Sequence, residues 1–182
     1  MDGGVIVYHV AITTADDYLT RREPHRQASF EYLMGLRAHG MMIAAGPAPD
    51  GRSCDLFCRV QQPGDIEKVV ETNPLFVDGL WTGYSPRSFA EFLEPWELPP
   101  PRPDETRLAT LVEGATPDAE MASFVFIEER GAGRLLFGGF FPDGSSLAFM
   151  ISADPTAAIA PLDASGLFTA GTLRARPLLH IV

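Results

Sequence analysis

The chain of 182 residues is 46% hydrophobic and 21% charged, which is the balance of a folded globular protein and not of a disordered one. Its 24 acidic and 14 basic residues give a formal net charge of −10, which argues against a broad binding surface for nucleic acid or anionic lipid. No apolar run reaches the length of about 18 residues that a membrane-spanning helix needs. Two cysteines, and a start at Met1–Gly4 without the basic residues of a signal peptide, lead us to expect a cytoplasmic protein.

Hydrophobic periodicity in the first half of the chain predicts the element order β-α-β-β-α-β. The predicted strands are 5–12, 41–45, 54–60 and one within 80–92, and the predicted helices are 23–39 and 63–71. The first helix opens on Glu23-Pro24 and stops at Gly40, because proline suits a first turn and glycine suits a helix end. This order is that of the ferredoxin-like unit. The face of its sheet that carries no helices has to be buried against a second unit or to line a ligand cavity.

A proline-rich stretch follows the first unit. Five prolines lie in the nine residues from Pro95 to Pro103, which gives a stiff connector that cannot continue a helix or a central strand. We therefore predict a first unit over residues 1–94, a linker over 95–104 and a second unit over 105–182.

The second unit repeats part of the first at an offset of 93 residues. Within a window of 21 residues, Gly40, Gly46, Pro49, Asp50, Gly51 and Ser53 recur as Gly133, Gly139, Pro142, Asp143, Gly144 and Ser146. Average composition predicts roughly one or two such matches. Two hairpins that share only their turn chemistry would also give some of them, but internal duplication explains the set better because apolar positions recur as well.

Four stretches of the first unit resemble the YCII-related (YciI-like) family. They are Arg22–His25, the helix Phe30–His39, Gly40–Pro47 and Asn73–Leu80, and the match covers roughly residues 5–92. Members of that family are similar in fold to muconolactone isomerase, in which ferredoxin-like units pair their sheets into a dimeric α/β barrel. The resemblance implies an α+β fold here, in which two tandem ferredoxin-like (βαββαβ) units form an intramolecular dimeric α/β barrel.

The resemblance also implies a kind of chemistry. The family is described as using a histidine with an aspartate as an acid–base pair, and one member dehydrochlorinates chlorinated hydroquinones. By motif, the histidine falls on His25 and the aspartate on Asn73. An asparagine can accept a hydrogen bond from imidazole but carries no charge to stabilise imidazolium. In the second unit Asp118 aligns with His25, so at most one of the two sites keeps the family's histidine.

Several residues near His25 are candidates for substrate binding. His25 itself lies in the first turn of a helix, where the dipole disfavours imidazolium, so we expect a neutral base near pH 7. Arg22 and Arg26 could hold an anionic substrate bidentately, although a solvated basic helix start explains them slightly better. His9, in mid-strand among apolar residues, is either a satisfied core residue or part of a cavity wall. Ser53 is a candidate hydrogen-bond donor to a ligand.

Weaker candidates complete the set. Three carboxylates could replace the missing aspartate: Asp16, Asp17 and Asp55. Tyr84 is a further candidate hydrogen-bond donor to a ligand. Cys54 and Cys58 are about 13 Å apart on a strand, which is too far for a disulfide or a shared zinc ion, and we expect two half-buried strand residues. The sequence contains no metal-ligand spacing and no phosphate or dinucleotide motif, so no metal or cofactor is expected.

We therefore predict a small-molecule enzyme of lyase or isomerase type, dehydrochlorinase-like, in which His25 acts as general acid and base in a barrel pocket. One alternative is a non-catalytic small-ligand-binding or regulatory barrel, which the asparagine at Asn73 favours. Another is an assembly module that serves partner enzymes through its exposed edges. Outer edge strands could also pair copies of the chain into a homo-oligomer.

Overall fold

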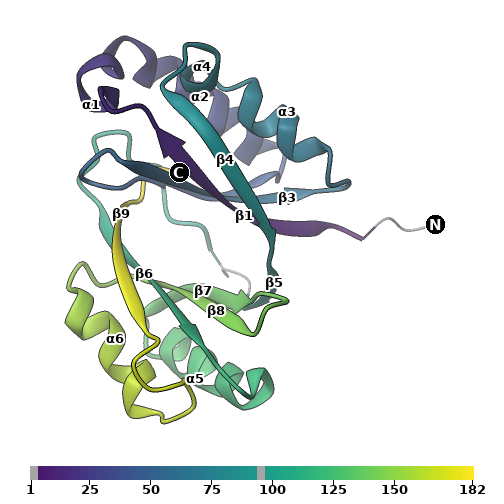
Figure 1. Cartoon of the computed structure of the whole chain (residues 1–182), viewed down its shortest axis with the longest axis vertical. Coiled ribbons are helices and arrows are strands. Elements are labelled where there is room, and N and C mark those ends of the chain that lie inside the picture. The colour runs from purple at the N-terminus through teal and green to yellow at the C-terminus, as the bar shows by residue number, and fades with distance from the viewer. Residues whose placement is uncertain (1–3, 94–96) are drawn as a thin grey trace. The chain divides into compact units, whose positions relative to one another are not determined.

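The computed structural model describes residues 4–93 and 97–182, which form two units (Figure 1). The first unit contains residues 4–88, 100–107 and 179–182, and the second contains the other described residues. The predicted boundary between residues 94 and 95 and the first three residues of the chain lie outside the described residues. From residue 97 to residue 107 the chain forms neither helix nor strand.

The first unit consists of one four-stranded antiparallel sheet and the helices that connect its strands. Its elements are β1 (Ile6–Thr14), α1 (Tyr18–Arg21), α2 (Glu23–Ala38), β2 (Met42–Pro47), β3 (Ser53–Val60), α3 (Asp65–Glu71), α4 (Pro74–Val77) and β4 (Trp81–Ser88). The strands lie in the order β2-β3-β1-β4. The four-residue helices α1 and α4 were not predicted, because such short elements do not generate a helical period.

Local chemistry explains where the main elements of the first unit begin and end. Pro24 occupies the first turn of α2, where its missing N–H would have no intrahelical partner. The helix is followed by Gly40, whose φ of 72° is in the left-handed region that glycine adopts without strain. The β2–β3 turn likewise places Gly51 at a φ of 69°. Both glycines belong to the pattern that recurs at Gly133 (φ 74°) and Gly144 (φ 84°) in the second unit.

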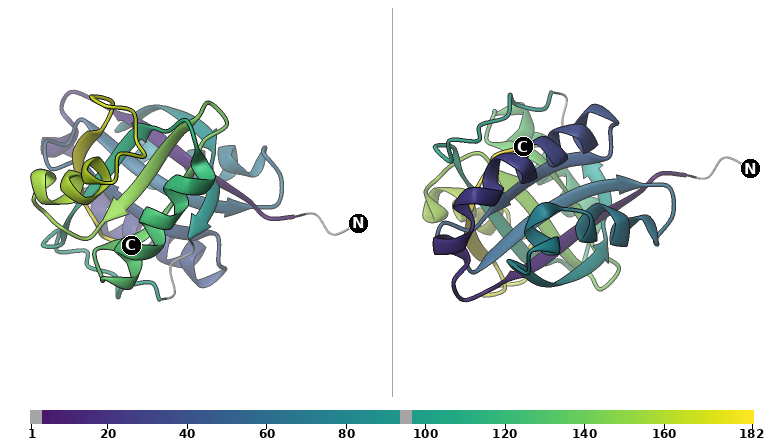
Figure 2. Two further views of the ribbon diagram at one scale, coloured as in Figure 1. Left: turned by 90° about the horizontal axis from the view of Figure 1, so that it is seen from below. Right: turned by 90° about the horizontal axis from the view of Figure 1, so that it is seen from above.

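The helices of the first unit cover one face of its sheet, as the right-hand view of Figure 2 shows for α2 and α3. Alternate residues of the strands point into the core between the sheet and the helices. They include Val10 and Ile12 from β1 and Leu56 and Val60 from β3. Cys54 and Cys58 lie on the same side and are fully buried free thiols, not half-buried ones, because the core continues beneath both.

The second unit has the order β-α-β-β-α-β, without counterparts of α1 and α4, and an additional strand precedes it. Its elements are β5 (Ala90–Leu93), β6 (Leu108–Ala115), α5 (Ala119–Gly131), β7 (Leu135–Phe140), β8 (Ser145–Met150), α6 (Pro155–Ala164) and β9 (Arg174–Leu179). The strand order is β5-β7-β8-β6-β9. The fold class is therefore mixed α+β with two antiparallel sheets, while internal duplication and the closure of the sheets into one barrel stay predictions.

Candidate functional site

His25 forms an ion-pair contact with a carboxylate that sequence reasoning did not select. Its Nδ1 lies 3.0 Å from Oδ2 of Asp78, the residue that ends α4. The His25 side chain is 29% exposed and that of Asp78 is 48% exposed, so the pair is open to water. The carbonyl oxygen of Asp78 also accepts a hydrogen bond from Nη2 of Arg21 at 3.1 Å. Helix α4 thus positions a carboxylate at the first turn of α2.

Asn73, the predicted partner of His25, has a different position. It is completely buried, and its Oδ1 accepts hydrogen bonds from the Leu75 backbone N–H at 2.9 Å and from the Ser29 hydroxyl at 3.0 Å. Asn73 is thereby the N-cap of α4, a position where asparagine is strongly favoured. Within the described part of the chain, the carboxylate at His25 comes from Asp78 and not from the position of Asn73.

The two predicted substrate-binding arginines are already engaged within the first unit. Arg22 donates from both terminal nitrogens to the two carboxylate oxygens of Glu105, each at 2.8 Å, and it lies over the Tyr18 ring. Burial opposes the charge of Arg22, but the Glu105 carboxylate outweighs it and raises the pKa of the guanidinium. Arg26 contacts Glu23 at 3.1 Å and donates to the Pro103 carbonyl at 2.8 Å. Arg22 is therefore structural, whereas Arg26 also lines a cleft.

That cleft lies along α2 and has a volume of about 280 Å³. Its walls include Arg26, Gln27, Phe30 and Leu75, together with Glu105 from the segment after the proline-rich stretch. His25 is not among the residues that line it. A smaller pocket of about 30 Å³ shares several of the same walls and extends toward the sheet. The cleft thus has a polar entrance and an apolar inner part.

Neutral hydrogen-bonding groups surround this inner pocket. The Cys54 thiol donates to the Tyr18 hydroxyl, with 3.8 Å between sulfur and oxygen. Burial raises the pKa of Cys54 to about 12 and raises that of Tyr18 above its ordinary range, so both groups keep their protons at neutral pH. The buried indole N–H of Trp81 is directed at the Cys54 thiol, where its hydrogen bond opposes part of the effect of burial on the pKa of that group. The pocket therefore contains no thiolate nucleophile.

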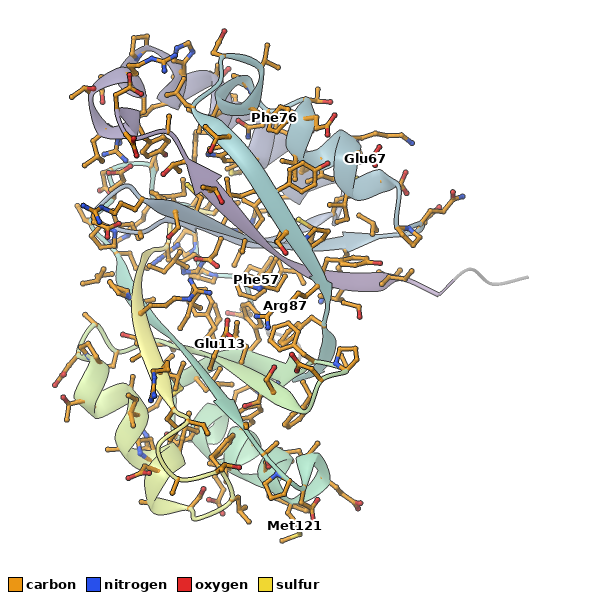
Figure 3. All side chains as sticks on the ribbon, in the orientation of Figure 1. Phe57, Glu67, Phe76, Arg87, Glu113 and Met121 are labelled. Atoms are coloured by element: carbon orange, nitrogen blue, oxygen red, sulfur yellow. The ribbon has the colours of Figure 1, made fainter. Side chains whose placement is uncertain are left out.

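His9 and Ser53 lie on the other face of the same sheet. His9 in β1 contacts the Asp55 carboxylate with 2.6 Å between Nε2 and Oδ1, and the two residues are 1% and 2% exposed. The strand register places Phe57 and Arg87 beside His9 on this face, away from the helices that carry Glu67 and Phe76 (Figure 3). Ser53 lies two residues before Asp55 on β3, so its side chain points to the same face of the sheet. The six predicted site residues are thus divided between two faces of the sheet and do not form one site.

The residues that sequence reasoning missed depend on elements that it did not predict. Asp78 follows the four-residue helix α4, and Tyr18 begins α1 in a segment predicted as loop. Tyr84, a candidate ligand donor, instead donates to the Glu71 carboxylate at 2.8 Å. Among the described residues, no cluster of three or more potential ligand side chains could hold a metal ion, and no helix is long and apolar enough to cross a membrane.

Comparison with solved structures shows the fold. A candidate monooxygenase from Lactobacillus acidophilus NCFM matches with a TM-score of 0.63 at 11% identity, over 97% of this chain and 94% of its own. A candidate monooxygenase from Fusobacterium nucleatum matches with a TM-score of 0.63 at 9% identity, over 100% of this chain and 94% of its own. The chain has the fold of these monooxygenase-like proteins. At such identities the likeness establishes the fold and no activity.

A third match is to the dehydrochlorinase of 5-chloro-2-hydroxyhydroquinone from Burkholderia phenoliruptrix in complex with 2,5-dihydroxybenzoquinone. It covers 44% of this chain and 89% of the other at 18% identity, and its TM-score of 0.39 is too low to carry an argument. No family model matches the sequence, and no curated protein matches it. The resemblance to the YCII-related family therefore stays a prediction.

Proposed function

We propose that the protein is a small-molecule enzyme of lyase or isomerase type in which His25 moves a proton and Asp78 orients it. The observation that carries the proposal is the 3.0 Å contact between Nδ1 of His25 and the Asp78 carboxylate. It supplies the carboxylate partner that Asn73 cannot supply. The general likeness to small-molecule enzymes in fold is compatible with this role but does not specify it.

The pair can act as a general base that is regenerated as an acid. When Asp78 accepts the Nδ1–H, the lone pair of His25 is on Nε2, which can take a proton from a carbon next to a carbonyl or from a phenol. The Asp78 carboxylate then stabilises the imidazolium, while the N-terminal end of α2 opposes it. Arg26, one residue along α2, contributes a positive charge at the cleft.

A screen of small phenols and lactones by thermal shift, followed by turnover assays on the compounds that bind, tests this function. We expect His25→Gln to lower kcat by about 100-fold or more, and Asp78→Asn to lower it by about 10-fold to 100-fold, because the first removes the proton carrier and the second only its partner. His39→Gln is the matched control, since His39 is an exposed histidine at the opposite end of α2. Turnover that survives in His25→Gln at the wild-type rate would contradict the proposal.

A second candidate function is non-catalytic ligand binding in the α2 cleft. It is favoured by the position of His25 outside the cleft walls and by the uncharged lining of the inner pocket. The same screen separates the two functions. A binding protein would be stabilised equally in wild type and His25→Gln, would lose that stabilisation in Arg26→Met, and would turn over none of its ligands.

A further inference from the structure

Arg107 has an arrangement of hydrogen-bond donors that the rest of the first unit does not satisfy. Its Nη1 donates to the Pro100 carbonyl at 2.7 Å. Its Nε and Nη2 are fully shielded from solvent and have no hydrogen-bond partner among the described residues. Buried donors of a guanidinium are costly to leave unpaired, and native structures seldom do so without a ligand or an ordered water.

The two unsatisfied nitrogens lie on one edge of the guanidinium. The N–H bonds of Nε and Nη2 run parallel, which is the geometry that matches two oxygens of a carboxylate or a phosphate. In the second unit, the corresponding edge of another arginine binds a carboxylate. There, Nε and Nη2 of Arg134 hold the two carboxylate oxygens of Glu129 at 2.6 and 2.7 Å. Arg107 has the same pair of donors, Nε and Nη2, but no carboxylate of the described residues is bound to them.

The surroundings of Arg107 are cationic. Its carbonyl accepts the backbone N–H of His180 at 2.9 Å, so the segment 100–107 runs beside residues 179–182. Burial lowers the pKa of Arg107, and the charges of Arg102 and Arg37 lower it further, while Asp104 opposes them. Asp104 is itself occupied, because its carboxylate accepts hydrogen bonds from the backbone and hydroxyl of Thr106. Two basic side chains and one acidic side chain thus act on the guanidinium of Arg107.

We propose that the Nε–Nη2 edge of Arg107 binds a small oxyanion, a carboxylate or a phosphate group. Bound there, the anion would pair with a shielded guanidinium next to Arg37 and the buried imidazole of His180. Such an interaction is strong because water does not screen it. This site is separate from His25 and from the α2 cleft, so it does not depend on the function proposed above.

Thermal unfolding in phosphate tests the site. Wild type is melted in a phosphate-free buffer at pH 7.5 with increasing sodium phosphate or sodium acetate, and sodium chloride keeps the ionic strength constant. We expect the Tm to rise by roughly 5–10 °C once the anion exceeds its Kd a hundredfold. Acetate and phosphate arms distinguish a carboxylate from a phosphate ligand. A Tm that stays unchanged in both anions would overturn the proposal and leave a buried water as the partner of Arg107.

Two further measurements keep the result specific to Arg107. We expect Arg107→Met to lose the response, and Arg52→Met to keep it, since Arg52 is an exposed turn arginine of the same unit. A full response in Arg107→Met would overturn the assignment. In wild type, NMR titration of His180 needs no variant, and we expect its pKa to rise when phosphate is added because a nearby anion favours imidazolium. If the pKa of His180 does not change when phosphate is added, binding at this edge is contradicted.

Discussion

The imidazole of His180 is buried near two arginines, and burial, more than these neighbours, determines its charge. It is 2% exposed, and burial together with the charges of Arg107 and Arg37 lowers its pKa to about 3. His180 is therefore neutral at physiological pH, and the sequence alone does not show this because the arginines come from distant segments. A neutral histidine in the folded protein has a measurable consequence in acid.

We expect acid to destabilise the protein through His180. The unfolded chain binds this proton near pH 6.5 and the folded protein near pH 3, so the unfolded state holds more protons between these values. The free energy of unfolding should fall by up to about 2.5 kcal/mol between pH 6.5 and pH 4.5 from this residue. Urea denaturation across that range measures it. His180→Gln should have a correspondingly shallower pH dependence, and an unchanged slope would contradict the lowered pKa.

At the scale of elements, α4 connects the core to the candidate acid–base pair. Its cap Asn73 is fully buried and links the helix to Ser29 of α2, while Asp78 at its other end faces His25. The sequence prediction made Asn73 the partner of His25, whereas the structure places Asp78 there. A four-residue helix decides which side chain reaches His25, and no period reveals so short a turn.

We expect Asn73→Ala to lower the free energy of unfolding by about 2 kcal/mol, because it removes the cap of α4 and the acceptor of the Ser29 hydroxyl. Urea denaturation monitored by circular dichroism measures the loss. Asn73→Ser is the control, since it keeps a capping oxygen and should cost less. Equal losses in the two variants would show that packing, and not the cap, is what Asn73 contributes.

The predicted strand within residues 80–92 illustrates where sequence reasoning fails. The structure divides it into β4, which belongs to the first unit, and β5, which belongs to the second. Pro86 is tolerated in β4 because that strand is at the sheet edge, and the buried Phe89 separates the two strands. Local propensity predicts extended backbone throughout this stretch, whereas the partner of each strand is decided by distant residues. The longer helices and strands were thus predictable, whereas the short helices α1 and α4 and the division of this stretch between two sheets were not.

At the scale of the whole molecule, each sheet gains an extra segment at the corresponding edge. Residues 181 and 182 form backbone hydrogen bonds with Ala45 of β2, and β5 pairs with β7. The strands that receive these segments contain Gly46 and Gly139, which recur in the repeat. A Cβ at Gly46 would overlap the carbonyl oxygen of Leu179, and one at Gly139 would overlap that of Ala90. The recurring glycines therefore make room for a neighbouring backbone.

We expect Gly46→Ala to destabilise the protein by about 3 kcal/mol or more, because the obstacle is backbone and the segment from Leu179 has to move. Gly35→Ala is the matched control. A Cβ on that glycine of α2 meets nothing within 4 Å, and alanine should stabilise the helix by about 1 kcal/mol. Thermal and urea denaturation of both variants give the comparison. A Gly46→Ala protein as stable as wild type would contradict the close approach.

The contact of β2 with residues 179–182 also imposes an order of events during synthesis. The first unit emerges from the ribosome before the second, yet its core includes Val182 and its sheet edge is completed by the segment beside Ala45. The unit translated first is therefore completed last, after the whole second unit has been made. Until then β2 presents an uncovered edge, which is the kind of surface that chaperones recognise on nascent chains.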